Sequence, residues 1–238
     1  IAGNILVNVN ATNFGTDDAE ASASADLYAG NNMTIAGDIT VQANALNNAV
    51  NGYSADADAD LDVYAYNDLF ITGDILVSAD AQIQGGYYAS ASADADIGAG
   101  NNATILTDPI TVSATALNQG GSYAYAYAYL DIFAYGGEGG GGDLYITGDV
   151  LTTADASGTD YNTGSASASL YAGNDLTVLY GTTPPTASAP PALVQTPPTW
   201  AEYFYGSDDV DSEAGSFYAS LEIEGGGTVL IEPKSVAP

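Results

Sequence analysis

The chain has 238 residues, with 30 acidic residues against one basic residue and a formal net charge of −29 at pH 7. Binding to nucleic acid or to anionic membranes depends on clustered Lys or Arg, so neither is expected of a chain whose only Lys or Arg is Lys234. The chain also lacks His, Cys and Arg, which removes the usual general bases, nucleophiles and zinc ligands. We therefore expect a protein that is not an enzyme; a polysaccharide-cleaving β-helix with paired carboxylates is the remaining enzymatic alternative.

Apolar residues make up 46% of the chain, which is enough for a packed core. No apolar run is long enough to span a membrane, so no spanning segment is expected. The absence of Cys fits a bacterial or archaeal surface protein that never relied on disulfides, although cytosolic proteins can also lack Cys. The sequence begins without Met or a signal peptide, and we expect a mature form or an excised segment.

The chain repeats with a period of about 35 residues. Corner motifs begin at Ala29, Ala65, Ala99 and Ala172, with a Gly-rich variant after Ala134. Each corner precedes two short strands separated by a turn and then an alanine-alternating third strand, all with a period of two, which predicts β-structure. A unit of this size cannot bury its own apolar face. We therefore predict an all-β fold, a parallel β-solenoid of about six coils with three short strands per coil.

Stacking predicts that equivalent positions form columns, and the apolar columns must face inward. A column of alanines should let opposing walls approach closely and give a flattened cross-section. The predicted inward columns are Leu27, Val63, Ile97, Ile132 and Leu170; Ala23, Ala59, Ala93, Ala128 and Ala166; Ile5, Ile39, Ile75, Ile110 and Val150; and Val7, Val41, Val77, Val112 and Thr152.

Outward columns carry the candidate functional residues. One is an aromatic ladder, which Gly98 interrupts, and beside it run columns of aspartate. Like charges about 4.8 Å apart repel, and raised pKa values, salt screening or bound Ca²⁺ would relieve them. The alternative to a calcium site is a solvated acidic face, and no cofactor is required. The members are Tyr28, Tyr64, Phe133 and Tyr171 in the ladder, and Asp26, Asp62, Asp96, Asp131, Asp60 and Asp94 in the aspartate columns.

One coil differs from its neighbours in the stretch SYAYAYAYLDIFAY, residues 122–135. Its alanines continue the inward columns, but tyrosines stand where the coils before and after hold Asp or Ser. We predict that this coil is a contact face for another fibre, a glycan or a protein. Its residues are Tyr123, Tyr125, Tyr127, Tyr129 and Tyr135.

Polar residues at the corners suggest two further features. Stacked amides of Asn31, Asn67, Asn101 and Asn174 would form an asparagine ladder from coil to coil. Aspartates that follow Gly at turns either bind nearby backbone N–H groups or ligate a metal, and the first is favoured; they are Asp38, Asp74 and Asp149. Three Asn-X-Thr sequons are candidate glycosylation sites, at Asn10, Asn32 and Asn102.

The repeat is interrupted in two places. Residues 135–142 replace one corner with glycines. Residues 182–199 hold six of the nine prolines and are expected to leave the solenoid. We divide the chain into solenoid repeats at 1–181, a Pro-rich insertion at 182–199, and an aromatic segment with a degenerate final coil at 200–238. The aromatic group at 200–205 is expected to fold back as a plug or to dock on a neighbour.

The chain starts in mid-coil and stops close to the same phase of the repeat. Such an arrangement leaves an open sheet edge at each end, so either more chain has been cut away or another subunit continues the stack. Complementary ends give a contact that does not close, so we expect a head-to-tail homopolymer.

The segments AGNNMTIAGDITV (29–41), AYNDLFITGDILV (65–77) and AGNDLTV (172–178) resemble repeats of filamentous-haemagglutinin-like exoproteins of the two-partner secretion type. The resemblance implies a right-handed parallel β-helix on a bacterial surface, exported and non-enzymatic, and it carries over no catalytic residue. We therefore expect an extracellular structural protein that forms a fibre or stalk. The alternative is a surface adhesin segment that binds glycans or a protein partner through its Tyr and Asp face, with or without Ca²⁺.

Overall fold

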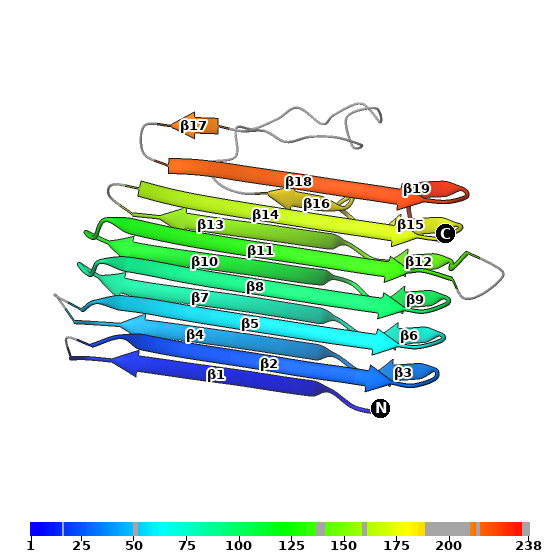
Figure 1. Ribbon diagram of the computed structural model, residues 1–238, viewed down its shortest axis with the longest axis horizontal. Coiled ribbons are helices and arrows are strands. Elements are labelled where there is room, and N and C mark those ends of the chain that lie inside the picture. The colour runs from blue at the N-terminus through cyan, green and yellow to red at the C-terminus, as the bar shows by residue number, and fades with distance from the viewer. Residues whose placement is uncertain are drawn as a thin grey trace.

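The protein is an all-β solenoid, as a computed structural model shows for residues 1–15, 17–49, 52–136, 141–158, 161–188, 210–212 and 215–234. Three strands make each coil, and successive coils lie directly on one another (Figure 1). The predicted parallel β-solenoid is confirmed, with about five complete turns and a sixth interrupted coil. No helix in the described part of the chain could cross a membrane.

Each coil contributes one strand to each of three sheets, which we call the first long wall, the second long wall and the short wall. The first long wall contains β1 (Ile5–Asn13), β4 (Ile39–Asn47), β7 (Ile75–Gln84), β10 (Ile110–Gln119), β13 (Val150–Ser157) and β16 (Thr186–Ser188). The second long wall contains β2 (Ala19–Ala29), β5 (Ser54–Ala65), β8 (Tyr88–Ala99), β11 (Tyr123–Ala134), β14 (Tyr161–Ala172), β18 (Gly215–Gly225) and β17 (Val210–Ser212). The short wall contains β3 (Met33–Ala36), β6 (Leu69–Thr72), β9 (Ala103–Leu106), β12 (Leu144–Thr147), β15 (Leu176–Tyr180) and β19 (Val229–Pro233).

The predicted columns coincide with the pairing register. All strand pairs within the three walls are parallel except β17 with β18, and equivalent residues are direct partners. Ala23 pairs with Ala59, for example, and that column continues without a shift through the next coils. Alternate side chains along each strand are buried and accessible, so a one-residue slip would turn the whole core outward.

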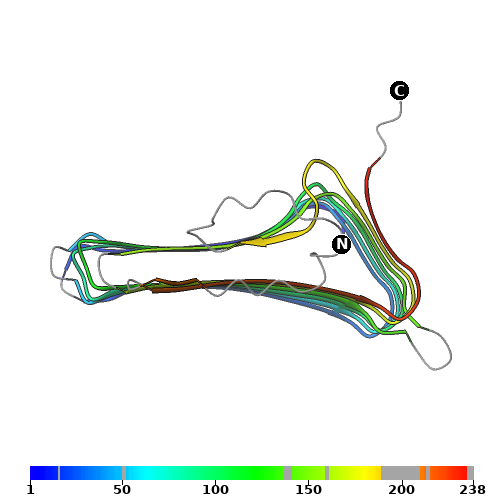
Figure 2. The same ribbon diagram turned by 90° about the horizontal axis from the view of Figure 1, so that it is seen from above.

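The cross-section is long and narrow, as the alanine columns predict (Figure 2). The two long walls run close together over most of their length and diverge only where they meet the short wall. Large side chains such as Ile39 and Ile97 belong to the end near the short wall, whereas alanines such as Ala45 and Ala57 line the narrow part. The side-chain volume along each coil therefore sets the separation of the walls.

The two ends of the stack differ. In the first coil, the inward residues of β1 are only partly buried, although their partners in β4 are fully buried. Leu6 and Tyr28 in this coil are 68% and 72% exposed. At the other end, β17 pairs antiparallel with the beginning of β18, from Gly215 to Phe217. The last coil thus carries a short covering strand that the first coil lacks within the described residues.

The interruptions lie partly outside the described residues. Residues 137–140 of the glycine-rich corner, residues 189–199 of the Pro-rich segment and the aromatic group at 200–205 are among those not described. Residues 186–188, which the sequence placed in the insertion, instead form β16 and pair with β13. This stretch, Thr-Ala-Ser, has no proline, so its N–H groups remain available to a parallel ladder.

Candidate functional site

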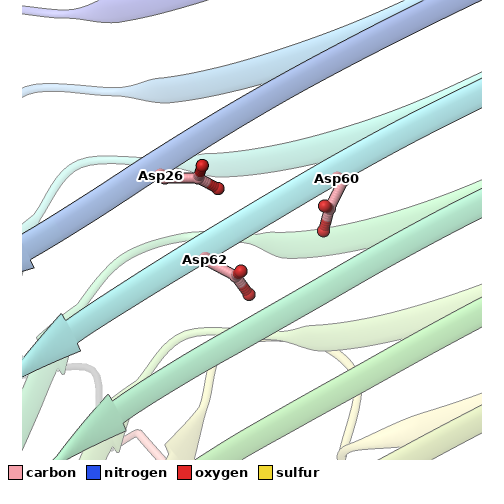
Figure 3. A group of neighbouring side chains, drawn as sticks. All are labelled: Asp26, Asp60 and Asp62. Carbon is pink, nitrogen blue, oxygen red and sulfur yellow. The ribbon is translucent and has the colours of Figure 1, made fainter.

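The outward side of the second long wall carries the aspartate columns. Alternation places Ala59 and Leu61 inside the wall, so Asp60 and Asp62 project outward from β5, beside Asp26 on β2. Carboxylate oxygens of these three aspartates lie within 4.8 Å of one another (Figure 3). The columns continue in register through Asp94 and Asp96 on β8 to Asp131 on β11.

Partial burial and mutual repulsion raise the pKa values of these carboxyls. Burial, followed by the charges of Asp96 and Asp60, raises the pKa of Asp94 to about 6. Burial, followed by the charges of Asp62 and Asp26, raises the pKa of Asp60 above its usual value. The pKa of Asp96 is raised by burial and then by Asp131. The columns are thus electrostatically crowded near neutral pH.

The cluster of Asp26, Asp60 and Asp62 fits a hard cation only in part. Carboxylate oxygens suit Ca²⁺, but this ion takes about six to eight oxygen ligands in flexible geometry. The three side chains stand exposed on a flat wall, so water or a second molecule would have to supply the remaining ligands. This arrangement is also that of a solvated acidic face.

The predicted aromatic ladder forms, but with a gap. Tyr28 and Tyr64 stack with ring centroids 5.8 Å apart and planes 17° apart. Gly98 leaves the next position empty, and the ring of Phe133 leans into it and approaches Tyr64 at 6.2 Å. Tyr135 joins the run by contacting Phe133 at 4.7 Å and Tyr171 at 5.7 Å. Rings engaged in this way stabilise neighbouring coils.

The tyrosines of β11 are arranged differently. Tyr127 lies between Ser92 and Ser165 of the adjacent strands, and Tyr129 lies between Asp94 and Ser167. Small neighbours leave these rings 44% and 39% exposed. The same row begins with Tyr123 and Tyr125, which stack on each other at 6.2 Å. The predicted contact face is thus a row of tyrosines along one strand, flanked by hydroxyl and carboxylate groups.

A shallow cleft of about 250 Å³ continues this surface toward the last coil. Rings from Phe133, Tyr135 and Tyr171 line it together with the carboxylates of Glu222 and Glu224. Glu222 occupies the column of Asp131, with Ser169 between them, so acidic character persists to the end of the wall. Aromatic rings beside carboxylates can bind a sugar or a cationic side chain.

Sequence reasoning missed a second cluster of tyrosines at the narrow edge of the solenoid. Four successive coils each carry a tyrosine at or just before the start of their strand in the second long wall. These tyrosines are Tyr53, Tyr87, Tyr123 and Tyr161. Their rings contact one another in order, at 5.8, 5.2 and 6.4 Å. The spacing of these tyrosines in the sequence, close to the period of the repeat, was the signal that could have revealed them.

Polar ladders run along the corners. The side-chain amide of Asn67 donates to Asn31 at 2.5 Å, and the backbone N–H of Asn101 donates to the carbonyl of Asn67. Asn174 donates its side-chain amide to Asp143. A side-chain bond therefore joins the first two members of the predicted asparagine column, and an aspartate takes part nearer its end.

A neighbouring ladder was not predicted. In this ladder, a side-chain oxygen in each coil accepts a hydrogen bond from a backbone N–H of the next coil. The accepting residues are Asn32, Asp68, Asn102 and Asp143, with N···O distances of 3.3, 3.4, 3.0 and 3.2 Å. Each side chain thereby satisfies a turn N–H that cannot join a strand ladder. Two sequon residues, Asn32 and Asn102, belong to this ladder, and Asn10 lies on β1 beside Asn44; all three are exposed.

The aspartates that follow Gly also bind backbone N–H groups. Asp38 and Asp74 each accept the N–H of the equivalent residue one coil further, at 3.1 and 3.2 Å. Burial alone would raise the pKa of Asp149, but bonds from the Thr182 hydroxyl and from three backbone N–H groups outweigh it and lower that pKa. These contacts give the Gly-Asp turns a structural role that needs no metal.

The fold and its ladders define the chain as a β-solenoid built from aligned columns. Comparison with protein-family models, with curated proteins and with solved structures gave no match.

Proposed function

We propose that this chain is a structural module of an extracellular fibre or stalk, in which solenoid coils stack from one subunit to the next. The observation that carries the proposal is the incomplete covering of the first coil. Among the described residues, β1 and β2 have no strand on their outer edges, whereas the end of β3 pairs with residues 1–3 through the bridge between Ala2 and Ala36. The inward residues Ile5, Val7 and Val9 of β1 are only partly buried. An exposed, regular edge of this kind invites pairing with another chain unless something covers it.

The last coil offers complementary columns. The column that begins with Ala23 in β2 ends with Ala219 in β18, and the column that begins with Leu27 ends with Ile223. On the short wall, the column of Met33 ends with Val229. A second copy placed on the first coil would therefore continue these three inward columns with apolar residues of the same face, and Val7 would follow Ala187 of β16 on the first long wall. A contact between unlike ends does not close and generates a filament.

β17 bears on this proposal, because it occupies the outer edge of β18 over its first residues. Only Gly215 to Phe217 of that edge are covered, and the pair of Val210 with Phe217 marks the limit. A docking subunit would either pair with the remainder of β18 or displace β17. The strand is thus positioned to weaken end-to-end association and to limit filament growth.

Other features support an exported structural role. The surface is strongly acidic, which keeps a long stack soluble. The chain has no His, Cys or Arg for ordinary catalysis, and its repeats resemble those of two-partner secretion exoproteins. These features favour an extracellular, non-enzymatic protein that associates with itself and does not bind nucleic acid.

Val7→Lys tests the proposal. Val7 lies inward on the uncovered coil, where it is only partly buried, so the monomer has room for the lysine head at the open end. A docked second copy would bury that charge. We expect the parent protein to form species whose sedimentation coefficient grows with concentration, and V7K to remain monomeric.

The control, Asn10→Lys, changes charge on the outward side of the same strand and should leave association intact. A monomeric parent protein would contradict the proposal.

A second candidate function is an adhesin face, and the exposed rings of Tyr127 and Tyr129 favour it. Open aromatic faces flanked by serines are suited to stacking on a sugar ring. Binding of the parent protein to a glycan array that is lost in the double variant Tyr127→Ala/Tyr129→Ala would support this role. Tyr66→Ala removes a ring that is even more exposed, at 62%, and lies away from the row, so it serves as the control.

A further inference from the structure

The chain passes from the first long wall to the second at the narrow edge of the solenoid (Figures 1 and 2). Six tyrosines belong to this edge, at or near the start of the strands of the second long wall. They belong to four successive coils, so residues about 35 positions apart in the sequence become neighbours. The members are Tyr53, Tyr87, Tyr88, Tyr123, Tyr125 and Tyr161.

Tyr87 is the centre of this tyrosine cluster. Its ring stacks on Tyr53 at 5.8 Å and meets Tyr123 edge-on at 5.2 Å. It also contacts its chain neighbour Tyr88 at 6.1 Å. Tyr53 and Tyr87 are 58% and 53% exposed, so a reagent in solution can reach both rings.

The chemistry of phenols gives this cluster a use beyond packing. We propose that the cluster is a site of oxidative tyrosine coupling, in which a one-electron oxidant joins neighbouring coils through a dityrosine bond. Two phenols each lose one electron and one proton, and the two phenoxyl radicals form one carbon–carbon bond between ring positions ortho to the oxygens. The hydrogens on those carbons then move to oxygen and restore both phenols. With hydrogen peroxide as the oxidant, used by a haem peroxidase, the peroxide is reduced to two waters.

The composition of the cluster favours coupling here over the other aromatic run. The ladder at the opposite end of the second long wall, near the short wall, contains Phe133, which has no phenol and cannot form a phenoxyl radical. Each ring of the narrow-edge cluster is a tyrosine. The Tyr88 hydroxyl also hydrogen-bonds to Asp56, a carboxylate that can accept the proton released on oxidation.

Such a bond would serve the same purpose as a disulfide between coils. The chain has no Cys, so no disulfide can tie one coil to the next. A link between Tyr53 and Tyr87, or between Tyr87 and Tyr123, would close a loop of one coil and restrict the unfolded chain. This inference does not depend on the proposed fibre role, because the rings belong to one subunit.

The test is oxidation of the dilute monomeric protein by a haem peroxidase and hydrogen peroxide. We expect blue dityrosine fluorescence in the monomer fraction, together with the loss of two hydrogen atoms per link. Cleavage at acidic residues followed by mass spectrometry should find peptides of Tyr53 or Tyr123 joined to the peptide that carries Tyr87. The linked monomer should melt at a higher temperature than the untreated protein.

Tyr87→Phe keeps the ring but removes the phenol at the centre of the cluster. It should lose most of the intramolecular product, whereas Tyr66→Phe, which alters a ring that is 62% exposed, should not. The proposal would be overturned by links that follow exposure alone and include Tyr66, by products that join only separate molecules, or by an unchanged yield in Y87F.

Discussion

The ring of Phe133 occupies the space above Gly98 that a side chain would otherwise fill. A methyl group built on Gly98 would lie 2.1 Å from the Phe133 ring, and this ring in turn reaches Tyr64 two coils away. Gly98 is thus the position that lets the aromatic ladder continue across a coil without a ring of its own.

Gly98→Ala should therefore destabilise the protein by about 1–3 kcal/mol, because the added methyl group displaces the Phe133 ring. Urea denaturation monitored by circular dichroism measures this change. Gly30→Ala is the control, since nothing lies within 4 Å of the methyl group it would add. Combining Gly98→Ala with Phe133→Ala should remove most of the cost due to the clash. If the two substitutions changed the free energy of unfolding additively, the predicted clash between a methyl group at position 98 and the Phe133 ring would be contradicted.

The inward column of valines continues into Thr152, which is fully buried and whose hydroxyl has no hydrogen-bond partner among the described residues. Thr152→Val removes the unsatisfied hydroxyl at almost unchanged volume and should stabilise the protein by about 1 kcal/mol. The same substitution at Thr111, on the outward side of β10, should have little effect. A lower midpoint for T152V in urea would mean that the hydroxyl has a partner.

The raised pKa values of the aspartate columns predict that acidification stabilises the fold. The folded form holds protons that the unfolded form releases, so the free energy of unfolding falls as pH rises from the unfolded value of 3.8 through about 6, the value for Asp94. The melting temperature should therefore be higher at pH 5 than at pH 7.5. The pKa of Asp149 is lowered, and its contribution is lost only at more acidic pH.

Asp94→Asn isolates this effect. The substitution removes a partly buried charge from the crowded column and should raise the melting temperature at pH 7.5 while reducing its dependence on pH. Glu232→Gln removes an exposed carboxylate at the end of the short wall and should change neither quantity appreciably. A melting temperature that does not change between pH 5 and pH 7.5 in the parent protein would contradict the crowding of charges.

Calcium removal separates the two expectations for Asp26, Asp60 and Asp62. Because three exposed carboxylates on a flat wall are an incomplete ligand set, we expect EGTA to leave the melting temperature unchanged and NaCl to raise it by screening. Thermal melts at matched ionic strength, with and without EGTA, measure the first effect, and melts over a series of NaCl concentrations measure the second. A fall in melting temperature with EGTA that Asp60→Asn abolishes would instead establish a structural calcium site.

Most of the architecture was predictable because a β-strand has a strict period of two and the coil length is nearly constant. Columns such as Ala23 with Ala59 follow directly from these two facts. Side chains in the loops were harder to predict, because their length varies between coils. Asn47 and Asn118 resemble ordinary loop residues, yet they are buried and donate to backbone carbonyls, whereas the equivalent position in the coil between them is Ile83.

The candidate site was only partly predictable for a related reason. Sequence columns place Tyr127 and Asp60 on the outward side, but they cannot say whether a ring stacks on its neighbours or keeps an open face. That depends on the side chains beside it, as the serines beside Tyr127 and the glycine beneath Phe133 illustrate. The covering strand β17 follows an interruption without repeat character, so no column predicted it.

Electron microscopy of the purified protein under native conditions tests the central claim most directly. If coils stack from subunit to subunit, the protein should form unbranched filaments whose strands lie across the axis with a spacing of about 4.8 Å. All subunits should point in the same direction, with the first coil of one against the last coil of the next. Single particles of one subunit at every concentration, or filaments whose strands run along the axis, would contradict it.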